Sequence, residues 1–102
     1  MSRVKEIFAK SRRLAVLRFL SEGAGYELNT SVLRSALDVI GFNCSRCAVE
    51  SECLYLEECG LVQVENIEGT GVVSVKLTER GLAVAKGDVF HPCVDRPSPP
   101  RS

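Results

Sequence analysis

The sequence predicts a small, mostly helical α+β domain: three helices, a two-stranded hairpin and a fourth helix, in that order. Two observations predict it. Three segments carry apolar residues at helical spacing and each stops at a glycine, namely Gly23, Gly41 and Gly60. The stretch 62–77 instead alternates apolar and polar residues around a Gly-Thr-Gly turn, which is typical of a hairpin. A chain of 102 residues has room for one domain.

The first two helices are expected over residues 4–22 and from Asn29 to Gly41. Asn29 is a favourable N-cap, and Leu28 and Leu33 occupy the two positions of a hydrophobic staple. The apolar stripe of the first helix consists of Ile7, Phe8, Leu14, Leu17 and Leu20. The expected buried face of the second consists of Val32, Leu33, Ala36, Leu37 and Ile40.

The third helix is predicted from Ser45 to Cys59, with Val49, Cys53 and Leu56 on its buried face. Only about four residues, Gly41 among them, separate it from the second helix. That spacing is typical of a helix-turn-helix, in which the second helix of the pair enters a DNA groove.

The hairpin places Val62 and Val64 on one strand, and Val73, Val75 and Leu77 on the facing one. Thr78 is the expected N-cap of a fourth helix that runs to about Lys86. Residues 1–87 therefore form the predicted domain. Residues 88–102 form a largely irregular tail that holds all four prolines: Pro92, Pro97, Pro99 and Pro100.

The order of these elements is the winged-helix pattern. Residues 56–62 (Leu-Glu-Glu-Cys-Gly-Leu-Val) and 76–81 (Lys-Leu-Thr-Glu-Arg-Gly) resemble a motif pair of bacterial winged-helix regulators, ArsR-like ones more distantly. The chain is similar to small winged-helix proteins of Mu-like bacteriophages and prophages through Arg-Arg-Leu-Ala-Val-Leu-Arg-Phe-Leu at 12–20 and Gly-Tyr-Glu-Leu-Asn at 25–29. It departs from them at Cys47 and Cys53, where an acid and a leucine are usual. The resemblance implies a winged helix-turn-helix fold and a DNA-binding or regulatory role.

Charge is balanced overall but unevenly spread. Residues 1–20 hold six basic side chains against one acid, whereas residues 21–60 hold seven acids against two arginines. The basic first helix is expected to meet phosphate, or else the acidic middle of the same or another copy. No apolar run approaches the roughly 18 residues of a membrane span, and no signal peptide opens the sequence. A cytoplasmic protein of the bacterial host cell, without a membrane partner, is therefore expected.

Five cysteines suggest a metal site, but their spacing does not favour one. Cys47, Cys53 and Cys59 are six residues apart on one predicted helix, so each is rotated about 240° from the last. One ion cannot collect thiols from three faces of a helix, and we expect neither metal nor cofactor. Buried cysteines act as small apolar side chains, and a redox pair of Cys44 and Cys47 stays a minor alternative.

An enzyme is not expected. His91 is the sole histidine and lies in the predicted tail, so no Ser-His-Asp or Cys-His set can be assembled with conviction. Gly69 and Gly71 belong to the hairpin turn and not to a phosphate-binding loop.

Double-stranded DNA is the predicted partner, with the start of the third helix nearest the bases. Arg46 is the side chain suited to guanine, and Ser45 or Asn43 to phosphate. The other residues expected there are Cys47, Glu50 and Ser51. At the start of the second helix, Asn29, Thr30 and Ser31 are expected to meet the DNA backbone through free N–H groups. Lys76 is expected to flank the groove. Arg12 and Arg13 either flank it too, pair with the acidic helix of a second copy, or form a solvated helix face.

The acids of the third helix oppose this prediction. Glu50, Glu52, Glu57 and Glu58 accompany a single arginine, and affinity for DNA depends largely on neutralised phosphates. The alternative is therefore a winged helix that serves as a protein–protein interaction or assembly module without DNA. A homodimer, formed through the first helix and the tail, is expected in either case.

Overall fold

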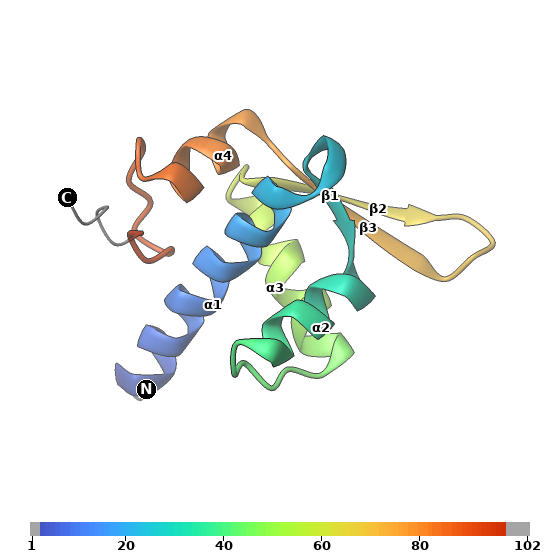
Figure 1. Ribbon diagram of the computed structural model, residues 1–102, viewed down its shortest axis with the longest axis horizontal. Helices are drawn as coiled ribbons and strands as arrows, with labels where there is room; N and C mark the ends of the chain where they lie inside the picture. Colours follow the sequence, from blue (N-terminus) through green and yellow to red (C-terminus); the bar gives the residue numbers. More distant parts are fainter. Residues whose placement is uncertain (1–2, 98–102) are drawn as a thin grey trace.

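The computed structural model describes residues 3–97, in which helices surround one end of a three-stranded antiparallel sheet (Figure 1). The mostly helical α+β class is therefore confirmed. The elements, in order, are α1 (Arg3–Glu22), the 3-10 helix η1 (Ala24–Tyr26), β1 (Glu27–Asn29), α2 (Thr30–Val39), α3 (Arg46–Glu58), β2 (Val62–Ile67), β3 (Val72–Leu77) and α4 (Glu79–Lys86).

Each of the last three helices begins at the predicted cap. The side chain of Asn29 accepts a hydrogen bond from the Val32 N–H, and that of Ser45 from the Ala48 N–H. Thr78 does the same for the Gly81 N–H at the start of α4. These side chains satisfy N–H groups that the first turn of a helix leaves without partners, which is why the sequence located the helix starts so closely.

Two helices end at the predicted glycines, in the Schellman geometry. The Phe42 N–H donates to the Leu37 carbonyl at 2.9 Å, and the Leu61 N–H donates to the Leu56 carbonyl at 3.0 Å. Gly41 and Gly60 make this possible, with φ of 98° and 79° that side chains with a Cβ rarely adopt. The chain therefore reverses sharply after α2 and after α3.

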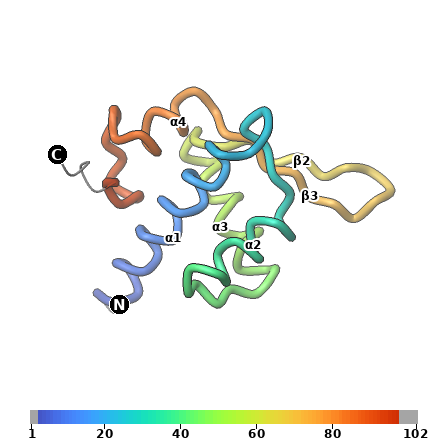
Figure 2. The backbone as a smooth tube through the Cα atoms, viewed as in Figure 1, coloured from blue at the N-terminus to red at the C-terminus, as the bar shows by residue number. Residues whose placement is uncertain are grey.

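The sheet has three strands, whereas the sequence predicted a two-stranded hairpin. The strand order is β1-β3-β2, and Leu28 of β1 lies opposite Val75 of β3. β1 could not be predicted from the sequence because three residues are too few to show an alternating pattern. The hairpin itself is confirmed, with Val64 opposite Val75, and its tip projects away from the helices (Figures 1 and 2).

The core forms where α1, α2, α3 and the sheet meet. Its fully buried side chains include Leu17, Leu20, Leu33, Leu37, Val49, Cys53, Leu56, Leu61, Val62 and Val75. Four predicted core residues are exposed instead: Ile7, Phe8, Val32 and Ile40. Helical spacing shows which residues share a face, but the first turns of α1 extend beyond α2 and α3 (Figure 1), and Ile7 and Phe8 there remain more than half exposed.

The predicted tail contains neither helix nor strand through Pro97, yet it packs on the helices. Val94 is buried, and the Asp95 N–H donates to the Lys10 carbonyl at 3.2 Å. Residues 1–2 and 98–102, with Pro99 and Pro100, lie outside the described residues. Within residues 3–97, no helix combines the length and the hydrophobicity that crossing a bilayer requires.

Close packing of α4 on the segment between α3 and β2 requires Gly81. A Cβ at this position would collide with the Leu61 carbonyl oxygen and lie 2.8 Å from Leu77 Cδ1. The same carbonyl accepts a hydrogen bond from the Thr78 N–H, so it cannot easily move.

We expect Gly81→Ala to lower the free energy of unfolding by about 1–3 kcal/mol, the usual cost of overpacking. On helix propensity alone the change would instead stabilise the protein by about 1 kcal/mol. Urea denaturation measures the difference, with Ala83→Gly in the same helix to calibrate propensity. A more stable Gly81→Ala protein would contradict the close approach.

Candidate nucleic-acid interface

The start of α3 is exposed. Residues 40–45 connect α2 to α3, and Ser45, Arg46 and Cys47 all lie at the surface. The Ser45 hydroxyl is engaged as the cap, since it accepts from the Ala48 N–H at 3.1 Å. Arg46 is thus the exposed cation nearest to the first turn, as the sequence predicted from its position.

Arg46 links α3 to the tip of the hairpin. Its Nη2 donates to the Gly71 carbonyl oxygen at 3.0 Å, and its Nε lies 3.4 Å from Glu50 Oε1. Through the first contact, the long Arg46 side chain bridges the start of α3 and the β2–β3 tip. The second offsets part of the positive charge, although the pair is exposed and therefore weak.

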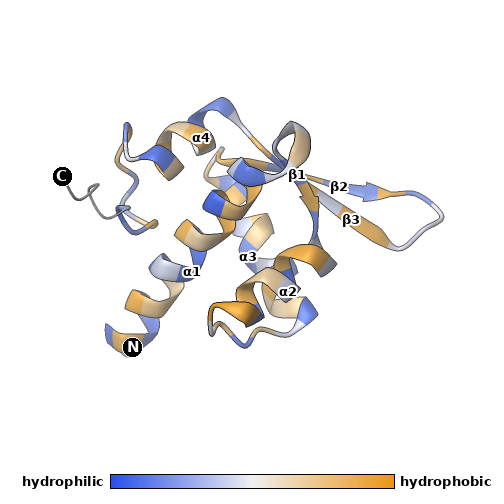
Figure 3. Ribbon diagram, viewed as in Figure 1, coloured by the Kyte–Doolittle hydropathy of each residue, from blue (hydrophilic) through white to orange (hydrophobic). Residues whose placement is uncertain are grey.

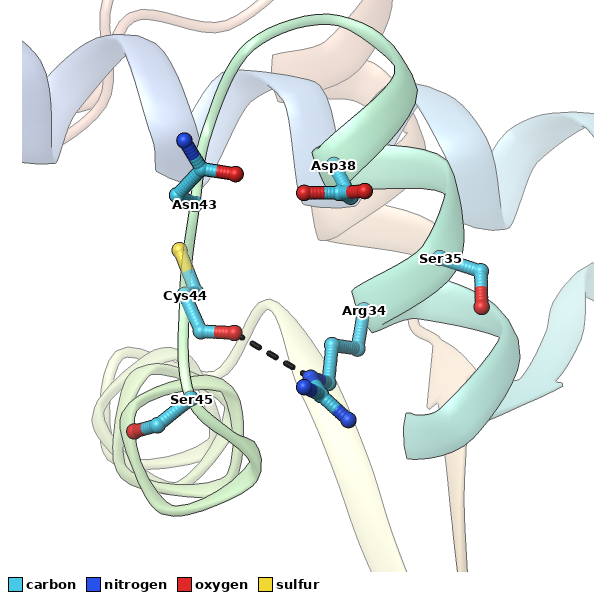
Figure 4. A pocket seen from close by; sticks show the side chains of 6 residues that line it. All are labelled: Arg34, Ser35, Asp38, Asn43, Cys44 and Ser45. Atoms are coloured by element: carbon cyan, nitrogen blue, oxygen red, sulfur yellow. Dashed lines mark hydrogen bonds between the residues drawn. The ribbon is translucent and has the colours of Figure 1, made fainter.

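A depression of about 490 Å³ lies between α2 and the turn that leads into α3 (Figure 4). Arg34 reaches across it, and its Nε donates to the Cys44 carbonyl at 3.2 Å. The remaining lining residues are Ser35, Asp38, Asn43, Cys44 and Ser45. The sequence analysis missed Arg34, although it is one of only two basic residues between 21 and 60 and so could have been singled out.

At the start of α2, the three predicted contact residues differ in what they can reach. Thr30 is buried, with 2% of its surface exposed, so its side chain cannot touch a ligand. Asn29 uses its side-chain oxygen as the cap of α2 at 2.8 Å from the Val32 nitrogen. Ser31 remains exposed. Thr30 therefore packs its side chain inward at the first turn, and the expected contact of its backbone N–H group with phosphate stays a prediction.

Lys76 is exposed but stands apart from the other cations. It lies opposite Glu27 in β1 and Gln63 in β2, at the far end of β3 from the tip. Five residues of strand separate it from Gly71, which is about 16 Å at the usual rise of a strand. The structure does not bring Lys76 to Arg46.

Arg12 and Arg13 are bound by the protein itself. Arg12 Nη2 lies 2.6 Å from Glu52 Oε2, and Arg13 Nε lies 2.6 Å from Glu52 Oε1. The Glu52 side chain is only 5% exposed. The sequence allowed the basic first helix to meet either phosphate or acids of the same or another copy. In the structure, Arg12 and Arg13 pair with an acid in the middle of the same chain.

Arg13 makes two further contacts. Its Nη1 donates to the Cys93 carbonyl at 2.9 Å, and its guanidinium carbon lies 4.3 Å from the centre of the Tyr55 ring. A cation over an aromatic face is favourable, and more so when partly desolvated. Arg13 therefore joins α1, α3 and the tail, which explains why its charge is not offered to solvent.

The acids of α3 are not all beside its exposed start. Glu52 is buried between the two arginines, and the Glu57 carboxylate accepts the Val64 N–H at 2.8 Å, on the side of β2. Glu58 lies at the far end of the helix. Only Glu50 remains next to Arg46, which removes much of the electrostatic objection that the sequence raised.

The five cysteines differ in how far they are buried. Cys53 is buried, and burial raises the pKa of its thiol to about 12, so it stays protonated and packs as an apolar group. Cys47 is exposed, and the other three are partly buried. No group of three or more potential ligands is placed to hold a metal ion within residues 3–97.

His91 is held within the tail by a hydrogen bond to the backbone. Its Nδ1 accepts the Cys93 N–H at 3.1 Å, and the side chain is partly buried. Burial lowers the pKa of His91, and the charges of Arg80 and Arg13 lower it further. The neutral ring is therefore the form that fits this part of the tail.

Fold and site together define a small, mostly helical α+β protein with exposed arginines at a helix start beside a hairpin tip. The chain belongs to the family of the uncharacterized protein gp26 of Escherichia phage Mu. It is 41% identical to that protein over 96 residues, which cover 94% of this chain and 97% of gp26. An uncharacterized protein of Haemophilus influenzae is 40% identical over 78 residues, 76% of this chain and 74% of that protein. No protein-family model matches the chain.

The two arginines on Glu52 yield a stability prediction. Glu52→Gln keeps the shape but leaves both guanidiniums without a carboxylate, and breaking a buried ion pair costs about 3–5 kcal/mol. We expect a fall of that order in the free energy of unfolding, measured by urea denaturation. Glu58→Gln, at an exposed position of the same helix, is the matched control and should change stability by less than about 0.5 kcal/mol. If Glu52→Gln and Glu58→Gln change the free energy of unfolding equally, the ion pairs of Glu52 contribute nothing to stability.

His91 yields a pH prediction. Its folded pKa lies below the unfolded value of about 6.5, so the unfolded chain binds the proton more readily. The contribution of neutral His91 is complete above about pH 7 and is lost as pH falls through 6.5 toward the folded pKa. Thermal melts between pH 7.5 and 5 should therefore show a smaller drop in Tm for His91→Asn, which keeps an acceptor but does not titrate. If Tm depends on pH in the same way in His91→Asn and in the wild type, His91 is excluded as a source of the loss of stability at low pH.

Proposed function

We propose that this protein is a winged-helix protein that binds double-stranded DNA, with α3 in the major groove and the β2–β3 hairpin as the wing. The order of its helices and of the hairpin supports this fold, and β1 adds a third strand without changing that order. Its kinship with a protein of phage Mu makes a regulator of transcription or an architectural factor of a phage or prophage the proposed setting.

The contact between Arg46 and Gly71 is the observation that carries the proposal. A winged helix needs the hairpin tip beside the first turn of its recognition helix, so that helix and wing can meet adjacent parts of one duplex. The 3.0 Å hydrogen bond supports such an arrangement, and three further guanidinium N–H groups of Arg46, beyond those that face Gly71 and Glu50, remain for a base edge or a phosphate. Release of Gly71 or Glu50 when DNA approaches would free more of them.

Arg34 and Asn43 supply the second part of the surface. Both line the depression that adjoins Ser45, so a phosphate over it would meet a guanidinium and an amide, against the opposing charge of Asp38 on the same lining (Figure 4). In this arrangement Arg46 reads bases while Arg34 holds the backbone. Arg12 and Arg13 take no part, because Glu52 already neutralises them.

A protein-interaction module is the second candidate, and the wing favours it. Ile67 and Val72, on either side of the tip, are exposed apolar residues, and the turn between them carries Glu68 but no lysine or arginine. Together with Val32 they border a groove of about 320 Å³ beside β1. An apolar, acidic wing is better suited to another protein than to phosphate.

A salt titration of binding to random duplex DNA distinguishes the two. We expect affinity to fall steeply as salt rises, because neutralised phosphates release counterions. Arg46→Ala and Arg34→Ala should each weaken binding, and loss of one phosphate contact should reduce the slope of log K against log salt by about 1. Arg80→Ala, an exposed arginine of α4, is the matched control and should bind as the wild type does.

Glu50→Gln should strengthen binding, since it removes the acid beside Arg46. The absence of binding at low salt by both the wild type and Glu50→Gln would contradict the DNA proposal and favour the interaction module. Equal losses for Arg80→Ala and Arg46→Ala would contradict the proposed surface, although not DNA binding itself.

A further inference from the structure

Helix α1 carries a line of apolar residues beside its fully buried stripe. Val4, Phe8, Ala15 and Phe19 recur at spacings of four, seven and four residues, which places them along one line of the helix. Val4 and Phe8 are exposed, and Ala15 and Phe19 are only partly buried against the core, whereas Val16, Leu17 and Leu20 are buried. The core therefore covers this line only in part, which leaves apolar surface for another partner.

The end of α2 extends this face into a groove. Ala15, Arg18, Phe19 and Glu22 of α1 line it together with Ile40, which is 51% exposed, and its volume is about 240 Å³. Phe8 continues the surface toward the start of α1, where its ring meets that of Phe42 edge to face at 6.5 Å. Figure 3 shows the corresponding hydrophobic segments along the early turns of α1 and at the end of α2.

The rim of the groove is charged in a self-complementary way. Arg18 and Glu22 lie one turn apart on the same edge of α1, both exposed. Neither forms an ion pair with any residue between 3 and 97. A two-fold axis makes each residue pair occur twice, so a helix that carries one charge of each sign, one turn apart, matches an antiparallel copy of itself.

We infer that this groove docks a second copy of the chain, through antiparallel packing of the two α1 helices about an axis near Phe19. Arg18 of one protomer then faces Glu22 of its partner, and the reciprocal pair forms on the other side of the axis. Phe19, Ala15 and Ile40 from both protomers fill the space between. This inference does not rest on DNA binding, since it concerns α1 and the end of α2 and is tested without nucleic acid.

A charge swap tests the inference. Sedimentation analysis of the full chain, without DNA, should show a dimer for the wild type. Arg18→Glu and Glu22→Arg each turn two attractive pairs into like-charge contacts, so each should raise the dissociation constant at least about tenfold. The double variant Arg18→Glu/Glu22→Arg recreates both pairs with the signs exchanged and should restore the dimer. Ile40→Asp should dissociate it by placing a charge in the apolar part of the groove.

Arg80→Glu, at an exposed position of α4, is the matched control for the charge change and should remain dimeric. Circular dichroism of each variant verifies that the fold is retained. A wild type that is monomeric across the accessible concentrations would overturn the inference. This outcome would include the case in which a different protein occupies the groove. A dimer that is insensitive to the single charge reversals, or one that the double variant does not restore, would overturn it as well.

Discussion

The carboxylate of Glu52 is the interaction on which the rest of this structure depends. A carboxylate that is 5% exposed would be very costly alone, but here each of its oxygens meets an arginine of α1 at 2.6 Å. Because Arg13 also binds the Cys93 carbonyl and lies over Tyr55, the same cluster joins α3, α1 and the tail. Ion pairs of this kind contribute little net stability compared with apolar packing, yet removal of one partner is expensive.

The same cluster determines where the outer charges lie. Arg12 and Arg13 of α1 and Glu52 of α3 neutralise one another, so none of the three presents a free charge at the surface. Glu57 accepts a hydrogen bond from the Val64 N–H, on the side of β2. The exposed start of α3 is then left with Arg46, Glu50 and, across the turn, Arg34. The proposed DNA interface is therefore displaced from the basic first helix, where the sequence shows the most positive charge, to a surface with few but well-placed arginines.

Much of the fold could be predicted because local chemistry marks its boundaries. Asn29, Ser45 and Thr78 cap the helices where expected, and Gly41 and Gly60 end two of them. β1 escaped prediction since its strand character comes only from pairing with β3. The exposure of Ile7 and Phe8 could not be predicted either, because the periodicity of apolar residues does not reveal whether another element covers the face that they share. The charges of the candidate site were harder to predict. Sequence alone gives no sign that Glu52 is buried, because only tertiary packing brings Arg12 and Arg13 to it.

The central claim is that the start of α3 and the hairpin tip form one surface for duplex DNA. NMR chemical-shift mapping of the backbone amides during a DNA titration at low salt tests this most directly. The account predicts that the largest shifts fall on residues 43–51 and 68–72, with Arg34 beside them and little change along 3–13. Shifts concentrated on α1, or none at all at saturating DNA, would contradict it.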